Sequence, residues 1–236
     1  MSTDAPLTIV REGTALFEAQ LNELSDAQLD EPSLLPDWSR RHVVAHVGYN
    51  ALAIARLVSW AETGVETPMF ESREARNAEI ATGAALPAAG LRKLSMHAGM
   101  LLDSAWQHLP EEKWAAEVQT AQGRMVEASF TIWMRTREVW IHAVDLNVTA
   151  GFANIPAPVL QRILGDILES WATRGELEGV RLEVSGVDGL VFGDRDARDP
   201  LVVSGDLAAL THWASGRLGA RVTCNHPVTS VAPSWL

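Results

Sequence analysis

The apolar positions of the first 150 residues recur at intervals of three and four, which is the spacing of amphipathic α-helices. Prolines fall between these periodic segments, where helix breakers are expected: Pro36, Pro68, Pro87 and Pro110. We therefore predict a four-helix bundle of long antiparallel helices with short connections and one small extra helix. The predicted helices cover residues of about 5–25, 39–62, 71–82, 88–108 and 127–148.

The pattern changes near residue 150. Residues 149–158 read TAGFANIPAP, and a glycine with two prolines is typical of a linker. One more helix is predicted at about 157–174, after which apolar and polar residues alternate as they do in strands. The sequence thus predicts a helical bundle at 1–150 and a small α+β domain at 151–236. The domain's strands are expected at 180–186, 189–193, 200–205 and 221–225, with a helix at about 206–216.

The composition excludes several classes of partner. The 30 acidic residues outnumber the 19 basic ones and give a net charge of −11, which argues against nucleic acid or an anionic membrane surface as the main partner. The single cysteine, Cys224, rules out a disulfide within the chain and favours a cytoplasmic protein. We expect no signal peptide and no membrane span, because no apolar run of about 18 residues occurs.

The segment 127–148 is largely apolar and is expected to be buried on most sides, yet it carries one polar stripe. The stripe recurs at spacings of three and four: Thr131, Arg135, Glu138, His142 and Asp145. Such groups are costly to bury unless they are paired or bind a metal. Glu138 and His142 are one turn apart, so both can reach one ion. The alternative is a Glu–His or His–Asp hydrogen bond within the helix, with Asp145 also able to pair with Arg135.

A third candidate ligand lies in the segment 36–60. His46 is surrounded by valine and alanine and is predicted to point inward, whereas His42 follows two arginines in the first helical turn, where exposure is expected. An inward histidine is more often a hydrogen-bonded core residue, but the Glu138/His142 pair makes His46 a candidate. Zinc accepts such a His₂Glu set and keeps one coordination position open, although iron, nickel or cobalt also fit.

Two arginines are candidates for binding a carboxylate. Arg76 lies in a predicted helix and is otherwise a surface residue, while Arg217 follows Gly216 at the end of another and otherwise stabilises the helix C-terminus. Cys224 lies in a predicted strand with no obvious base and is interpreted as a core thiol. The sequence has no phosphate-binding glycine loop, dinucleotide fingerprint or G-x-S-x-G motif.

Four runs together resemble the mycothiol-dependent maleylpyruvate isomerases over nearly the whole chain: DWSRRHVVAHVGYNA, ETPMFESREARNAEIATG, TAQGRMVEASFTIWMRTREVWIHAVDL and VVSGDLAALTHWASGR. This resemblance implies a DinB-like four-helix bundle followed by an α+β domain related to sterol carrier proteins. It implies a zinc ion on His46, Glu138 and His142. It also places the family's C-terminal arginine at Arg217 and a substrate-side arginine at Arg76.

The resemblance further implies a reaction, the cis–trans isomerisation of maleylpyruvate to fumarylpyruvate in gentisate degradation. Mycothiol would add to the double bond as its zinc-bound thiolate, the new single bond would rotate, and the thiol would leave, while the arginines pair with the carboxylates of the substrate. We expect a cytoplasmic monomer whose partners are a dicarboxylate and mycothiol. Two rival hypotheses are a mycothiol S-transferase acting on other electrophiles and a lipid carrier with a structural metal.

Overall fold

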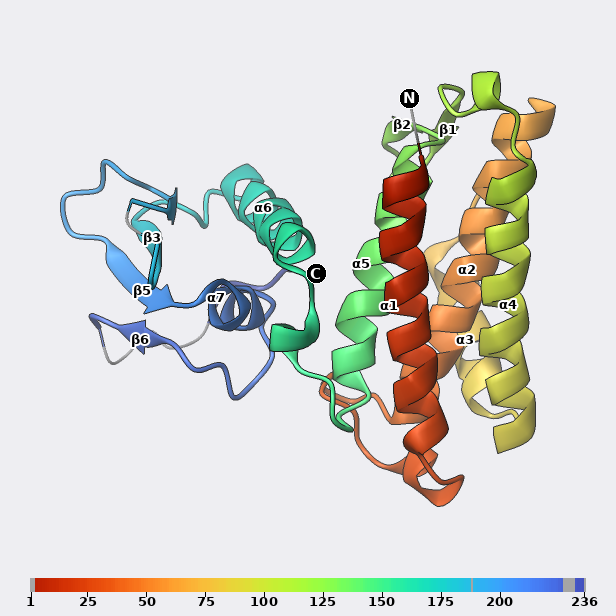
Figure 1. The fold of residues 1–236 in the computed structure, drawn as a ribbon, viewed down its shortest axis with the longest axis horizontal. Coiled ribbons are helices and arrows are strands. Elements are labelled where there is room, and N and C mark those ends of the chain that lie inside the picture. Colours follow the sequence, from red (N-terminus) through yellow and green to blue (C-terminus); the bar gives the residue numbers. More distant parts are fainter. Residues whose placement is uncertain (1–2, 188, 227–231, 236) are drawn as a thin grey trace. The chain divides into compact units, whose positions relative to one another are not determined.

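The computed structural model describes residues 3–187, 189–226 and 232–235. The chain folds as two compact units, residues 1–149 and residues 150–236, coloured red to green and green to blue in Figure 1. The first unit is a helical bundle and the second combines helices with a small sheet, so the predicted fold class is confirmed. None of the helices described is long and apolar enough to cross a membrane.

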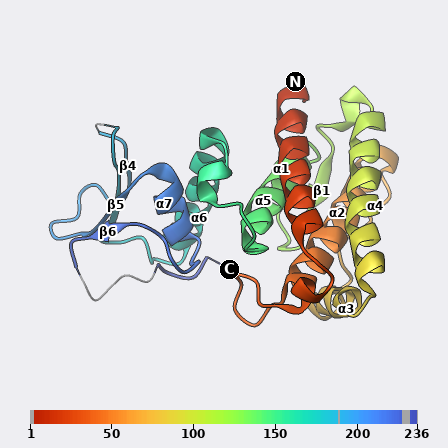
Figure 2. The ribbon, with the colours of Figure 1, turned by 60° about the horizontal axis from the view of Figure 1, so that its bottom comes forward.

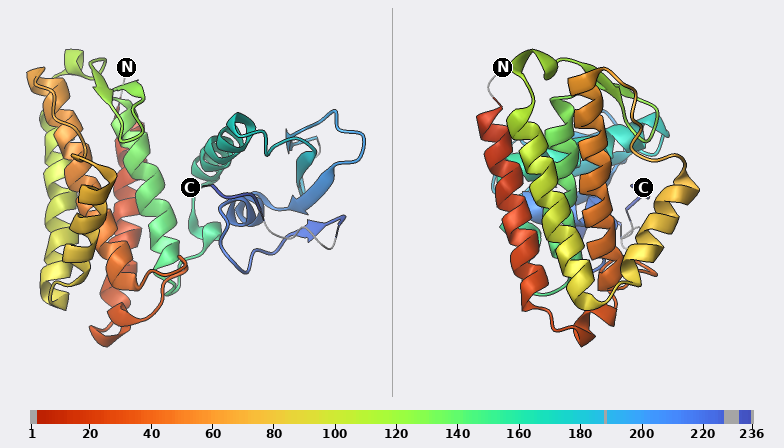
Figure 3. Two further views of the ribbon diagram at one scale, coloured as in Figure 1. Left: turned by 180° about the vertical axis from the view of Figure 1, so that it is seen from behind. Right: turned by 90° about the vertical axis from the view of Figure 1, so that its right-hand side faces the viewer.

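Four long helices form the bundle: α1 (Asp4–Glu23), α2 (Arg40–Thr63), α4 (Ala88–His108) and α5 (Phe130–Asp145). The smaller α3 (Arg73–Ala84) packs on α2, as Figure 3 shows from two further sides. Short 3₁₀ turns lie at η1 (Ala27–Asp30) and η2 (Glu111–Lys113). A hairpin of β1 (Glu117–Gln119) and β2 (Met125–Glu127), which the sequence did not predict, joins α4 to α5.

The helix directions differ from the prediction of antiparallel neighbours. The backbone of Gly48 in α2 faces Leu94 in α4, and the Nη1 of Arg41 donates to the carbonyl of Leu86, so α2 and α4 run in the same direction. The cause is the loop 64–72 with α3, which carries the chain back along α2 before α4 begins. Helical periodicity shows which face of a helix is buried but not the direction of its neighbour, so this crossover had no signal in the pattern.

Helices α1 and α5 run in the opposite direction to α2 and α4 and pack closely on each other. A Cβ at Gly13 in α1 would lie 2.8 Å from a methyl carbon of Val139 and 2.6 Å from Nε1 of Trp140 in α5, so glycine permits this approach. Most of α5 is buried, as its apolar composition predicts. The antiparallel pair α2 and α5 thus brings the histidine of one helix to the polar stripe of the other.

The second unit contains α6 (Ala157–Thr173), α7 (Leu207–Ala214) and a four-stranded sheet (Figure 2), and it begins with the short turn η3 (Phe152–Asn154). The strands are β3 (Val180–Val184), β4 (Val191–Gly193), β5 (Leu201–Gly205) and β6 (Thr223–Cys224). Their order is β4-β3-β5-β6, with β3 and β5 parallel and the other pairs antiparallel. Asp206 caps α7 by accepting from the backbone N–H of Ala209 at 2.7 Å.

Candidate metal centre

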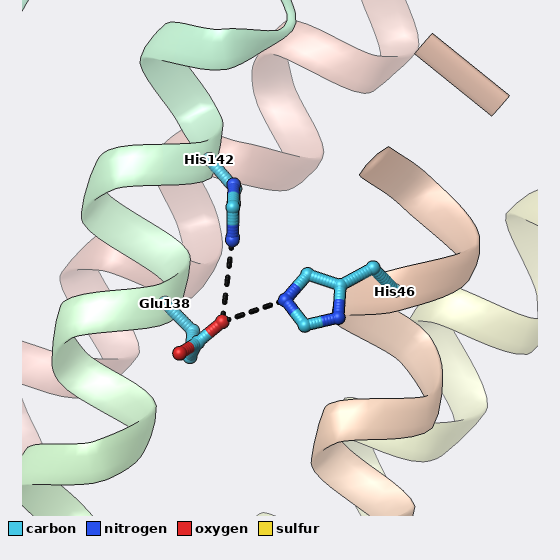
Figure 4. A group of neighbouring side chains, drawn as sticks. All are labelled: His46, Glu138 and His142. Carbon is cyan, nitrogen blue, oxygen red and sulfur yellow. Dashed lines mark hydrogen bonds and ion pairs between the residues drawn. The ribbon is translucent and has the colours of Figure 1, made fainter. Parts of the chain in front are cut away.

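The side chains of His46, Glu138 and His142 meet between α2 and α5 inside the first unit (Figure 4). Oε2 of Glu138 lies 2.8 Å from Nε2 of His46 and 3.2 Å from Nε2 of His142. The three ligand atoms all lie within 4.8 Å of one another, and the side chains are only 10–16% exposed. The structure therefore brings the three predicted ligands together in a buried group that can close around one ion.

The charges of this cluster are set by competition between burial and hydrogen bonding. Burial alone would raise the pKa of Glu138, but hydrogen bonds from His142 and His46 hold it well below its usual range. Burial lowers the pKa of His46, and its hydrogen bond to Glu138 offsets this only in part. Burial also opposes a charge on His142, yet its hydrogen bonds to Asp145 and Glu138 raise its pKa. The result is an ionised carboxylate between two imidazoles, which suits a cation.

Asp145 orients His142 from behind. Its side chain is fully buried, and its Oδ2 lies 2.8 Å from Nδ1 of His142, so that the other ring nitrogen faces Glu138. A carboxylate behind a ligating histidine fixes the ring and raises its basicity. Arg135, the alternative partner of Asp145 in the sequence, donates elsewhere: its Nη1 bonds the carbonyl of Val47 at 2.7 Å and Oδ1 of Asn50 at 3.0 Å. Burial lowers the pKa of Arg135 to about 10.

Two aromatic side chains near His46, those of His42 and Trp38, make structural contacts. Nδ1 of His42 lies 2.8 Å from the hydroxyl of Ser39, and the two residues form the capping box that begins α2. The indole of Trp38 meets the imidazole of His46 edge to face, with the ring centres 5.6 Å apart. Trp133 and Trp140, the two tryptophans of α5, are buried.

A cavity of about 80 Å³ lies beside the cluster, so a small ligand has room next to two of the three candidate ligands. Arg76, predicted from the sequence, is part of its wall, and its Nη2 lies 3.4 Å from Nδ1 of His46. Residues from α2, α3, α5, the loop after α2 and the hairpin line it: His46, Asn50, Met69, Phe70, Arg76, Ala121, Gln122, Met134, Arg137 and Glu138.

Sequence reasoning missed several of these lining residues. Arg137 was overlooked although Met134, Arg137 and Glu138 are spaced three and four apart and so share a helix face. The hairpin turn with Ala121 and Gln122 gave no comparable signal, because its two strands are three residues each.

Arg217 and Cys224 belong to the second unit. Arg217 follows Gly216, which ends α7 with a φ of 77°, and its Nη1 donates to the carbonyl of Ser215 at 2.9 Å. This contact with the end of the helix is the structural role that the sequence left open for it. Nearby, Nε2 of His212 lies 3.1 Å from the carbonyl of Leu218, which holds the loop after Arg217. Burial raises the pKa of the Cys224 thiol, which does not favour a nucleophile.

Comparisons with known proteins give consistent results for both units. The family model described as the mycothiol maleylpyruvate isomerase N-terminal domain matches residues 10–147, and the MDMPI C-terminal domain matches residues 154–234. Two crystal structures, of the mycothiol-dependent maleylpyruvate isomerase and of a histidine-to-alanine mutant, are 43% and 42% identical to this chain, each with a TM-score of 0.94. Each match covers 100% of this chain and 98% of the other. No curated protein matches the chain.

Proposed function

The chain belongs to the mycothiol-dependent maleylpyruvate isomerase family, and from this premise we propose that it converts maleylpyruvate to fumarylpyruvate with mycothiol as cosubstrate. The observation that carries the proposal is the His46–Glu138–His142 cluster beside a cavity with arginine in its wall. In the reaction, the thiol sulfur bonds to one alkene carbon, the resulting single bond rotates, and the same C–S bond breaks. The thiol is regenerated, so no oxidant or reductant is consumed.

His46, Glu138 and His142 would hold a zinc ion. Their donor atoms are close together, Glu138 is ionised, and Asp145 stabilises the orientation of His142, as metal-binding histidines require. When bound there, zinc would favour the thiolate form of a thiol at neutral pH.

The arginines supply positive charge for the carboxylates of the substrate. Arg76 lies beside His46, so a carboxylate that pairs with its guanidinium would also lie next to the cluster. Arg217 is assigned a second carboxylate on the resemblance to the family. The protein carries a net charge of −11 and repels a dianion at long range, so local guanidinium groups are needed to bind it.

The proposal also includes the roles of the two domains, the pathway, the cellular location and the oligomeric state that we expect from the sequence. The bundle, residues 1–150, is the metal-binding domain, and residues 151–236 form a sterol-carrier-like α+β domain. The enzyme acts in gentisate degradation as a cytoplasmic monomer. Light scattering coupled to size-exclusion chromatography tests the oligomeric state, because a monomer should have the mass of one chain, 25.7 kDa.

A spectrophotometric assay with maleylpyruvate tests the function, with and without mycothiol, before and after chelation. We expect conversion that needs mycothiol, stops on chelation and returns with zinc. His46→Ala should abolish it, whereas His97→Ala, which changes an exposed histidine on α4, serves as the matched control. Accumulation of stable mycothiol conjugates would favour an S-transferase, and no conversion by zinc-loaded protein would overturn the proposal.

A further inference from the structure

Asn50 places a neutral polar group of α2 in the wall of the cavity beside the His46–Glu138–His142 cluster. It follows His46 by four residues, so the two side chains lie on the same face of the helix. Only 7% of Asn50 is exposed, so it belongs to the interior of the bundle and not to its outer surface. Neither metal binding nor the pairing of carboxylates by arginine uses this side chain.

The orientation of the Asn50 amide is fixed by Arg135. Nη1 of Arg135 donates to the amide oxygen at 3.0 Å and to the carbonyl of Val47 at 2.7 Å. Arginine only donates, so the amide must turn its oxygen toward Arg135 and its nitrogen away from it. Arg135 is buried, and the carboxylates of Glu138 and Glu18 favour its charge. A hydrogen bond from a buried cation polarises the amide, which makes the N–H groups of Asn50 stronger donors.

The amide nitrogen of Asn50 carries two N–H groups and has no acceptor among the described residues. In that part of the chain, the buried side-chain atoms that lack a hydrogen-bond partner are Oε2 of Glu79, Nε1 of Trp171 and Nε of Arg181. The Asn50 nitrogen is not one of these enclosed atoms, so it opens on the cavity that its side chain lines. A donor in this position suits an oxygen atom of a ligand.

The proposed reaction moves negative charge onto one oxygen of the substrate. In maleylpyruvate the cis double bond is conjugated to a ketone. When the thiolate sulfur bonds to the alkene carbon farther from the ketone, an electron pair moves to the ketone oxygen and forms an enolate. After the new single bond rotates, the pair returns, the C–S bond breaks and the thiolate leaves. The two carboxylates stay charged throughout, so the arginines that pair with them do not stabilise the charge that develops on the ketone oxygen.

We propose that the amide nitrogen of Asn50 donates a hydrogen bond to this ketone oxygen and stabilises the enolate. Asn50 is then a catalytic residue, and this role rests on the proposed function. A donor that is oriented before the charge develops lowers the barrier, because it does not have to reorganise during the reaction. Arg76 adjoins His46, and Asn50 lies one turn after His46. A carboxylate and a ketone that are separated by only two alkene carbons can therefore contact both residues in one cavity.

Two variants of Asn50 test this role in the isomerase assay. Asn50→Ala removes the donors and the acceptor, whereas Asn50→Asp keeps an acceptor for Arg135 but has no N–H group. We expect both to lower kcat for maleylpyruvate about 100-fold, the effect of removing one oxyanion donor, while the zinc content stays constant. Asn22→Asp, which changes an exposed asparagine on α1, is the matched control and should keep the kcat of the wild type. An unchanged kcat in Asn50→Ala would overturn the proposal. A loss confined to Asn50→Asp would also overturn it, because the added charge would then be the cause.

Calorimetry on zinc-loaded protein without mycothiol distinguishes a contact with the ketone from a general change in the cavity. Maleate keeps the cis alkene and two carboxylates but has no ketone. We expect Asn50→Ala to weaken maleylpyruvate binding about 3- to 10-fold, the range for one neutral hydrogen bond, and to leave maleate binding unchanged. Equal weakening of both ligands, unchanged maleylpyruvate binding or loss of zinc would contradict the contact. This comparison needs no turnover, so it still tests the contact if the wild type does not isomerise maleylpyruvate and the proposed function fails.

Discussion

Each ligand of the candidate metal centre has its properties set by a second contact. Asp145 lies behind His142, Trp38 packs on the ring of His46, and the two imidazoles flank Glu138. The grouping of these three side chains follows from the sequence in part, because Glu138 and His142 are polar groups one turn apart in an apolar helix and need partners. The contacts behind them could not, because they depend on how the ring of each histidine turns within the packed bundle.

Replacing Asp145 with asparagine should weaken the metal site without removing a ligand. Asparagine can still accept from Nδ1 of His142, but the negative charge that raises the basicity of the ring is lost. We expect zinc affinity to fall about 10- to 100-fold, measured by competition with a chelator. Asp103→Asn, which changes a surface carboxylate paired with Arg11, is the control. Equal zinc affinities for the two variants would show that Asp145 has no orienting role.

Metal binding should also depend on pH, with a predictable sign. The pKa of His142 is raised by Asp145 and Glu138 once the opposing effect of burial is overcome, so a proton remains on this ring to a higher pH than usual. The metal must displace that proton, since it binds the unprotonated nitrogen. Apparent zinc affinity should therefore fall as the pH decreases from 8 to 6, and binding near neutral pH should release protons. Calorimetry in buffers of different ionisation enthalpy measures the release of protons. A zinc affinity that does not change between pH 8 and pH 6 would contradict the assignment.

Hydrogen bonds at the helix ends connect α2 to α5, in addition to the packing of their side chains in the core. Arg40, in the first turn of α2, is buried, although the sequence indicated exposure there. Its guanidinium donates to the carbonyls of Leu146 and Asn147, at the end of α5, and to Glu31. Backbone carbonyls at a helix C-terminus lack hydrogen-bond donors within the helix, and Arg40 supplies donors to two of them. The sequence predicted the helices from their periodicity, but contacts between residues more than 100 positions apart follow only from the bundle.

Arg40→Met should destabilise the protein markedly. The variant leaves the buried carbonyl of Leu146 without its donor and removes the charged partner of Glu31, at a cost of about 3 kcal/mol. Urea denaturation followed by circular dichroism measures the loss. Arg11→Met removes an exposed ion pair with Asp103 and should change the free energy of unfolding by about 1 kcal/mol or less. A similar decrease in the free energy of unfolding in both variants would mean that the hydrogen bonds of Arg40 do not stabilise the contact between α2 and α5.

At the scale of the whole molecule, the candidate functional residues are divided unequally between the two units. The three candidate metal ligands, Asp145 and the described cavity all belong to residues 1–149, whereas Arg217 belongs to residues 150–236. The change from period 3.6 to period two revealed the second unit in the sequence. The hydrophobic pattern could not show the parallel course of α2 and α4 or the hairpin that adds Ala121 and Gln122 to the cavity.

This division predicts that residues 1–149, produced alone, still bind zinc. Every ligand and the carboxylate behind His142 lie within this unit, which has its own buried core around α1, α2, α4 and α5. We expect one zinc ion per fragment, with an affinity within about threefold of the full chain's, since the donor set is complete. Isomerase activity should be lost, because Arg217 is absent, and Arg217→Ala in the full chain should lose it too while keeping zinc. A folded fragment without zinc would show that the second unit shapes the metal centre, and an active fragment would remove Arg217 from the reaction.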